Sequence, residues 1–452
     1  MQKLITKYGL AAHLAFLAVA PLFLSPIDVL WLSLLGLTWL LMEPSKIGGE
    51  MLHDARRRVY GAAGRDPLLW VLLVVVVFAC ARWLNTGIAM AYNAEIGEWF
   101  LKGAAVPWFP GSAENSGAQE FVASVVLFVV VLGCRHALGK SARQAFLVLV
   151  SILLGIFGLV LSFLHYDGSA LVRSLAVFEL RAPIYVGIVF GLGFLTATGA
   201  MISAFERAWR VSIFLLLLSL AGNVAGLLVF SPVWTIAAFG AAGVLLFLFS
   251  FVYAKLTMSG NNEFKFLVGF SLGLVLAGVV AVGLVTENPL LEKLESIQNR
   301  TFFTQEYSSV RSTLSDVSRR VWQGHPWIGA GVGAFAHGVR FSATEEDWKT
   351  IPPDQAYALN GYWHFLAERG LVGALVALGP LVLLLVFYFR RLVAGMRCHL
   401  PSPSSWVGLV ALSVVLALML ADCAVFYPGV LTLTAAILAI SANSFPKEKD
   451  HV

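Results

Sequence analysis

Runs of about twenty apolar residues recur along most of the chain and are interrupted by one long polar segment, residues 287–369. The sequence is 59% hydrophobic and only 13% charged, with a mean hydropathy of +0.82. This composition excludes an ordinary soluble enzyme and predicts a polytopic membrane protein, because a helix of about 20 apolar residues spans the hydrocarbon of a bilayer. The predicted fold is therefore an all-α integral membrane protein with one large helical insertion.

Twelve stretches have the apolar character of membrane spans. They are residues 9–25, 27–42, 67–92, 120–135, 144–165, 182–204, 211–230, 232–254, 264–286, 370–389, 405–422 and 428–443. The first stretch resembles a signal peptide, but its apolar run continues past Pro21 and predicts an uncleaved helix. The predicted organisation is nine spans in residues 1–286, an outer lobe in residues 287–369, and three spans with a cytoplasmic tail in residues 370–452.

Lysine and arginine are distributed unevenly around these spans. With the amino terminus in the cytoplasm, all seven segments predicted to lie inside are basic, whereas the short outer loops carry few cations. This positive-inside pattern places both termini in the cytoplasm and residues 287–369 on the outer face. The net charge of +5 follows from the same bias, so it does not indicate a nucleic-acid partner.

Cysteine usage predicts neither a disulfide framework nor a zinc site. The four cysteines lie in or beside different spans without paired spacing: Cys80, Cys134, Cys398 and Cys423. We find no cluster of metal ligands elsewhere in the sequence, and we therefore predict no metal and no cofactor.

The polar segment begins with a helical pattern, because apolar residues recur every three to four positions from residue 287 to residue 323. On this predicted helix Arg311, Ser315 and Arg319 share one stripe, with Arg320 beside them. One interpretation is an amphipathic helix that rests on the membrane with its arginines facing lipid phosphates. The other is a site for a phosphate-bearing substrate.

A proline and three spaced glycines follow. Pro326 should end the helix, and Gly329, Gly331 and Gly333 allow unusual dihedral angles and a close approach to a ligand. The run follows neither a strand nor a Rossmann unit, so nucleotide binding is not predicted. Residues 341–357 are polar, contain an acidic cluster, and are predicted to form a mobile loop.

Together these runs resemble the O-antigen ligase and O-antigen polymerase family, the integral membrane transferases of bacterial surface polysaccharides. The resemblance covers residues 305–375 at motif level, and the whole chain in span number and loop placement. It rests on Arg311 fifteen residues before Pro326, on the Pro-x-x-Gly-x-Gly-x-Gly-x-Phe run from Pro326 to Phe335, on Asn360 with Glu368 eight residues later, and on Gly370-x-x-Gly373. It implies a GT-C-like fold in the bacterial inner membrane, with the active site facing the periplasm.

Family members transfer a glycan from an undecaprenyl-pyrophosphate carrier to a sugar hydroxyl. The resemblance thus implies a metal-independent glycosyltransferase of lipopolysaccharide or other surface-polysaccharide biosynthesis. Its partners would be the undecaprenyl-pyrophosphate-linked glycan, a sugar acceptor (a growing glycan or lipid A-core) and the bilayer. Because pyrophosphate is already a good leaving group, catalysis must neutralise its developing charge and orient or deprotonate the acceptor. Arginine suits the first task, since its planar fork binds phosphate oxygens bidentately.

The resemblance makes Arg311 the first cation for the pyrophosphate. Arg181, at the entrance of the sixth span, is the preferred second cation, with Arg173 as the alternative, and either could instead be an interfacial arginine. Further candidates for substrate contact are Arg319, Arg320, Gly331, Gly333, Asn360 and Glu368. Glu368 equally suits the start of the tenth span, where the helix dipole would stabilise its carboxylate.

One position departs from the family's pattern, because Leu359 stands where the ligases carry a histidine before the asparagine. This favours a polymerase over a ligase that joins O-antigen to lipid A-core. His364 and His337 are substitute candidates for a general base, and each also fits a structural role. Two other classes stay open: a lipid-linked oligosaccharide flippase or transporter, which the scarcity of ionisable residues in several spans disfavours, and a structural or regulatory membrane partner.

Arg82 lies toward the outer end of an apolar span, where an unpaired charge costs several kcal/mol. We expect a carboxylate or a lipid phosphate as its partner. Asp422, at the outer end of the eleventh span, is a candidate.

Overall fold

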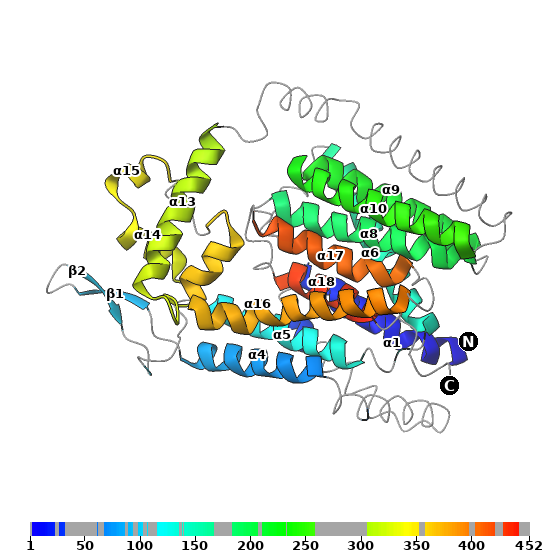
Figure 1. Ribbon diagram of the computed structural model, residues 1–452, viewed down its shortest axis with the longest axis horizontal. Coiled ribbons are helices and arrows are strands. Elements are labelled where there is room, and N and C mark those ends of the chain that lie inside the picture. The colour runs from blue at the N-terminus through cyan, green and yellow to red at the C-terminus, as the bar shows by residue number, and fades with distance from the viewer. Residues whose placement is uncertain are drawn as a thin grey trace.

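The computed structural model is a bundle of long helices with a smaller helical lobe at one end (Figure 1). The structure describes residues 2–22, 27–31, 61, 67–85, 89–93, 98–102, 106, 115–134, 138, 140–166, 183–206, 210–231, 233–257, 305–351, 358–396, 403–420 and 428–442.

The bundle contains most of the apolar helices. They are α1 (Gln2–Val19), continued by the 3-10 helix η1 (Ala20–Leu22), α4 (Pro67–Leu84), α5 (Asn115–Cys134), α6 (Lys140–Tyr166), α8 (Pro183–Glu206), α9 (Arg210–Phe230), α10 (Val233–Thr257), α16 (Gly361–Met396), α17 (Pro403–Leu418) and α18 (Pro428–Ala442). The lobe contains α13 (Gln305–Gly324), α14 (Phe335–Ser342), α15 (Glu345–Trp348) and the first turns of α16.

The prediction of a helical fold is confirmed, apart from one short antiparallel hairpin of β1 (Ala89–Asn93) and β2 (Glu98–Lys102). This hairpin corrects the predicted span 67–92, because α4 ends at Leu84 and residues 89–93 are extended. Most other helix bounds lie within a few residues of the predicted spans. The predicted span 264–286 and most of 27–42 lie outside the described residues.

Two helical stretches, Ser141–Leu161 in α6 and Thr235–Tyr253 in α10, are long and apolar enough to cross a membrane by length and composition. The remaining apolar stretches among the described helices are 10–17 residues long. A buried helix of a soluble protein can meet the same criteria, so the twelve spans stay a prediction.

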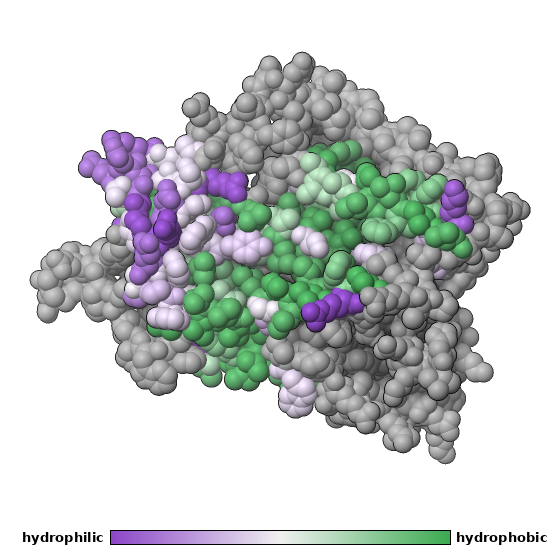
Figure 2. All heavy atoms as spheres, viewed as in Figure 1, coloured by the Kyte–Doolittle hydropathy of each residue, from purple (hydrophilic) through white to green (hydrophobic). Residues whose placement is uncertain are grey.

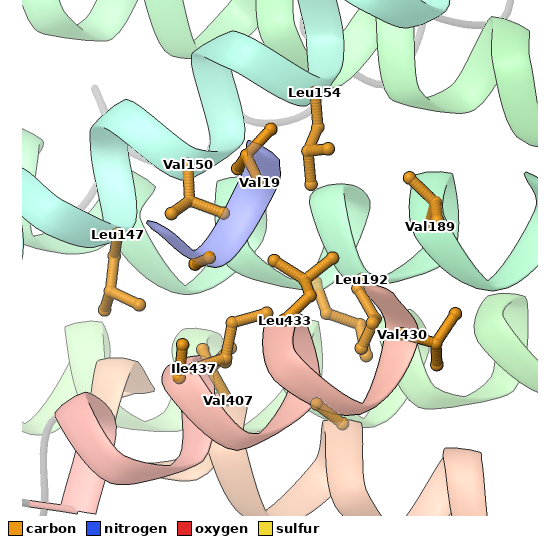
Figure 3. Packing of buried hydrophobic residues seen from close by; sticks show 14 of the residues in the cluster. Val19, Leu147, Val150, Leu154, Val189, Leu192, Val407, Val430, Leu433 and Ile437 are labelled. Carbon is orange, nitrogen blue, oxygen red and sulfur yellow. The ribbon is translucent and has the colours of Figure 1, made fainter. Parts of the chain in front are cut away.

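The centre of the bundle is formed by close contacts between helices that carry small residues. A Cβ atom added to Gly158 of α6 would lie 2.3 Å from the carbonyl oxygen of Gly222 in α9, so the two backbones touch there. In the core of the bundle, apolar side chains from distant segments face one another, as Leu154, Leu192 and Leu433 do in Figure 3. Helix α16, which carries part of the lobe, packs against α4 and α17 of this bundle.

Helix α16 connects the bundle to the lobe and is broken once. Gly370 has φ 63° and ψ −173°, so the helical path is interrupted between its first turns and its long apolar part. Residues before the break belong to the lobe, and residues after it run along the bundle (Figure 1). Hydrophilic residues gather over the lobe, while hydrophobic residues cover much of the visible bundle (Figure 2).

Candidate functional site

The lobe is built on α13, whose apolar side faces inward. Leu314, Val317 and Val321 are buried together with Phe335 of α14 and Ala367 of α16. The helix ends at Gly324, two residues before Pro326, as the sequence predicts. The predicted part of this helix before residue 305 lies outside the described residues.

The three spaced glycines adopt dihedral angles that favour glycine. Gly329, Gly331 and Gly333 have φ angles of 71°, 115° and 74°, which confirms the prediction of unusual backbone conformations. The close approach they permit is to another part of the chain. A Cβ atom at Gly329 would lie 2.4 Å from the main-chain nitrogen of Arg369, and one at Gly370 would lie 2.4 Å from the nitrogen of Gly329.

Residues 326–331 and residues 367–372 pair through their main chains, and we call this pairing the backbone clasp. Its four hydrogen bonds run from Ala330 N to Ala367 O at 2.8 Å, from Gly331 N to Glu368 O at 2.9 Å, from Leu371 N to Pro326 O at 2.9 Å and from Val372 N to Trp327 O at 3.0 Å. The clasp satisfies main-chain groups that the break at Gly370 removes from the helical ladder. Gly331, a candidate for substrate contact, thus uses its N–H within the clasp.

The side chain of Glu368, whose carbonyl oxygen belongs to the clasp, is buried and lies at the start of α14. One of its carboxylate oxygens accepts the N–H of Phe335, the first residue of α14, at 3.3 Å. The N-cap residue Ala334 offers no side-chain cap, so the carboxylate of Glu368 takes that place from another helix. The start of α14 is therefore a second helix amino terminus beside this carboxylate, and the stabilisation by the tenth span stays a prediction.

His364 lies one turn before Glu368 on the same helix and is 1% exposed. Its Nε2 atom is 3.6 Å from the carboxylate of Glu368, and its ring makes an edge contact with Phe335 at 4.8 Å between centroids. Burial lowers the pKa of His364 below its usual value, with Glu368 opposing this shift. Burial therefore favours the neutral form of the imidazole, which the lobe encloses.

Asn360 and Leu359 both have structural roles in this lobe. The side-chain oxygen of Asn360 accepts the N–H groups of Tyr362 at 3.1 Å and of Trp363 at 3.2 Å, which makes it the N-cap of α16. Leu359 packs against the buried cluster that contains Leu314. The position that carries histidine in the ligases is thus apolar and joined to the core of the lobe.

The arginines of α13 separate into different environments. Arg311 donates to the carbonyl oxygen of Leu420, directly after α17, where the lobe meets the bundle. Arg320 forms an ion pair with Asp347 of α15, and Arg319 is exposed. The structure therefore does not bring these three side chains together at one point.

The prediction of a mobile loop at 341–357 is wrong for residues 341–351. Thr344 and Asp347 form a capping box, in which the carboxylate of Asp347 accepts the main-chain N–H of Thr344 at 2.7 Å. Arg320 adds the ion pair from α13. The acidic cluster is thus the first turn of α15, where acidic residues are favourable.

Arg82 reaches the site from α4. Its guanidinium is buried and donates to the main-chain oxygen of Glu368 at 3.0 Å. This contact is to a carbonyl group, and the expected carboxylate or lipid phosphate partner stays a prediction. A charged residue in an apolar stretch signals that it has a specific partner. No sequence motif links Arg82 to Glu368, so that partner is not indicated by the sequence.

Several candidates cannot be placed. Arg173, Arg181 and Asp422 lie outside the described residues, and His337 belongs to α14 but its side chain is not among those described. Within the part of the chain that the structure describes, no three His, Cys, Asp or Glu side chains are grouped to hold a metal ion.

No model of a known protein family and no curated protein matches this sequence.

Proposed function

We propose that the protein is a membrane glycosyltransferase of surface-polysaccharide biosynthesis, of the O-antigen ligase and polymerase type. It would transfer a glycan from an undecaprenyl-pyrophosphate carrier to a sugar acceptor without a metal ion or another cofactor. The observation that carries this proposal is the backbone clasp. Two motifs that are individually weak, the glycine-rich run and the segment from Asn360 to Gly373, form one continuous structure.

The proposed setting is the bacterial inner membrane, with twelve spans, both termini in the cytoplasm and the lobe in the periplasm. The distribution of lysine and arginine supports this orientation. The position of the lobe supports it as well, because its hydrophilic residues lie at one end of an apolar bundle (Figure 2). A site at that end would meet both a membrane-held donor and a water-soluble glycan.

Arg311 is proposed to hold the donor pyrophosphate at this boundary. The Leu420 carbonyl keeps the guanidinium where α13 meets the end of α17, and Arg181 would provide the second cation. In the reaction, the bond between the sugar anomeric carbon and the pyrophosphate oxygen breaks and the acceptor hydroxyl oxygen forms the new glycosidic bond. The proton of that hydroxyl passes to water or to another group of the site. The arginines would stabilise the negative charge that develops on the leaving pyrophosphate.

A polymerase is favoured over a ligase by the environment of Leu359 and His364. Leu359 is partly buried, packs against the lobe core and cannot accept a proton. His364 has the neutral form that a base requires, but its ring is enclosed, so it would need an opening of the lobe to meet an acceptor. We therefore propose that departure of the pyrophosphate, assisted by arginine, is the main contribution to catalysis. A ligase is the alternative, and a flippase or transporter is the second alternative.

The test is turnover of an undecaprenyl-pyrophosphate-linked glycan by the purified protein and by Arg311→Lys. Lysine keeps the charge but loses the bidentate fork, so we expect a loss of about 10²-fold or more, the usual effect of removing one such donor. Arg340→Lys, an exposed arginine of α14, is the control and should act like wild type. Longer glycan on the same carrier would identify a polymerase, and glycan on lipid A-core a ligase. Wild-type turnover by Arg311→Lys would refute the role of Arg311, and no turnover by the native protein would refute the function.

A further inference from the structure

Arg82 joins α4 to the backbone clasp across 286 residues of sequence. It lies in the last turn of α4, and its side chain is 2% exposed. The Glu368 carbonyl that accepts its Nη2 donor at 3.0 Å also accepts the N–H of Gly331 at 2.9 Å. One carbonyl oxygen therefore connects α4, the glycine-rich run and α16, next to the break in α16.

The surrounding residues leave a space that fits this guanidinium. A Cβ atom on Gly373 would lie 3.1 Å from Arg82 Nη1 and 2.6 Å from the Cβ atom of Arg369. The ring of Phe78, one turn earlier on α4, lies 5.7 Å from the guanidinium carbon. Burying an arginine among apolar helices is costly, and an apolar residue would often pack there at no loss of stability. The arrangement thus favours a positioning role over a purely stabilising one.

Arg82 contacts the main chain of the residue that carries the acidic group of the site. It fixes the main chain of Glu368, whose carboxylate caps α14 and lies 3.6 Å from His364. Without Arg82, that main chain would be held at its carbonyl by Gly331, and the segment of α16 before Gly370 could separate more easily from the glycine-rich run. His364 and Phe335 would then lose the enclosure that keeps the ring buried.

We propose that Arg82 is a positioning residue, which acts through the Glu368 carbonyl to hold Glu368 and His364 against the start of α14. The consequence for the reaction rests on the proposed function. The geometric link itself does not, so it is tested by a measurement that needs no substrate.

That measurement is the rate at which diethyl pyrocarbonate modifies individual histidines, read by mass spectrometry of the peptides from full-length protein in detergent. His325 is exposed and serves as the internal reference. In Arg82→Met we expect modification of His364 to rise about ten- to hundred-fold, the opening that loss of one charged hydrogen bond would cause. Arg82→Lys keeps a cationic donor and should stay closer to wild type. Arg390→Met, an exposed arginine near the other end of α16, should match wild type at both histidines.

Unchanged His364 modification in Arg82→Met would overturn the proposal. An equal rise at His13, a partly buried histidine of α1 in the bundle, would also overturn it, because that result indicates general unfolding. If Arg82→Met does not fold, Gly373→Ser decides the question by the same measurement, because its side chain crowds the guanidinium. Modification of His364 should rise in this variant, and an unchanged rate would overturn the proposal. In the turnover assay, loosened variants should lose kcat with little change in KM. Loosening with unchanged kcat would overturn the positioning role. A native protein without turnover would refute the proposed function alone, and the histidine rates would still decide the role of Arg82.

Discussion

The bundle and the lobe both depend on glycine, but for different physical reasons. In the bundle, Gly158 and Gly222 are in helical conformation and let α6 and α9 approach each other closely. In the lobe, Gly329 and Gly370 have φ angles of 71° and 63° and also face main-chain atoms across the clasp. A larger side chain is therefore excluded from a glycine position in the bundle by lack of space alone. At a glycine position in the clasp it is excluded by lack of space and also by the positive φ of the backbone.

This difference indicates how each region should respond to change. Two helices that meet at small residues can move apart slightly and keep their hydrogen bonds, since those bonds lie within each helix. The clasp has no such freedom, because its hydrogen bonds run between the same two segments that a new side chain would push apart. We expect the lobe to be the less tolerant region.

The largest effect is predicted for Gly370→Ala. The positive φ and the contact with Gly329 should together cost at least about 2 kcal/mol, and the lobe should open. Gly379→Ala is the matched control, because a Cβ there, on the same helix, would meet nothing within 4 Å. The measurement is thermal unfolding in detergent, combined with hydrogen exchange of peptides from residues 326–335. Equal stability of the two variants would show that the clasp does not restrain α16.

A smaller effect is predicted for Gly158→Ala in the bundle. The added methyl group would meet the Gly222 carbonyl, and the helices would have to shift, at a cost of about 1–3 kcal/mol. Gly240→Ala in α10 has open space around it and should be neutral or slightly stabilising. Thermal unfolding of both variants gives the comparison. A loss at Gly158 that exceeds the loss at Gly370 would reverse the order of tolerance argued above.

Much of the lobe could be predicted because its signals are local. The end of α13 near Pro326 and the positive φ angles of the spaced glycines follow from the chemistry of those residues. The capping box from Thr344 to Asp347 was also present in the sequence, but the polar composition of 341–357 led to the prediction of a mobile loop. In that case a local signal was available and was outweighed by composition.

The partners of these residues could not be predicted, because they come from distant parts of the chain. Nothing near Gly329 indicates that it touches Gly370, and nothing near Arg82 indicates the carbonyl of Glu368. For the same reason the sequence around Glu368 does not indicate that its carboxylate also accepts the N–H of Phe335 at the start of α14. The predicted roles of Arg311 and Arg181 in catalysis stay predictions.

The smallest effect is predicted for Asp347→Asn, at the outer edge of the lobe. Burial alone would raise the pKa of Asp347, but hydrogen bonds from Thr344 and Arg320 together lower it below its usual value near 3.8. A carboxylate with a lowered pKa stabilises the folded state above the unfolded pKa, and this contribution is lost as pH falls through the folded pKa. Because Arg320 is 39% exposed, we expect a loss of about 1 kcal/mol or less at neutral pH.

Hydrogen exchange of residues 341–351 should therefore accelerate in Asp347→Asn at pH 7 and differ less from wild type near pH 3. Glu346→Gln, exposed in the same turn, is the control, and an equal response in both variants would show that the ion pair does not hold α15 against α13.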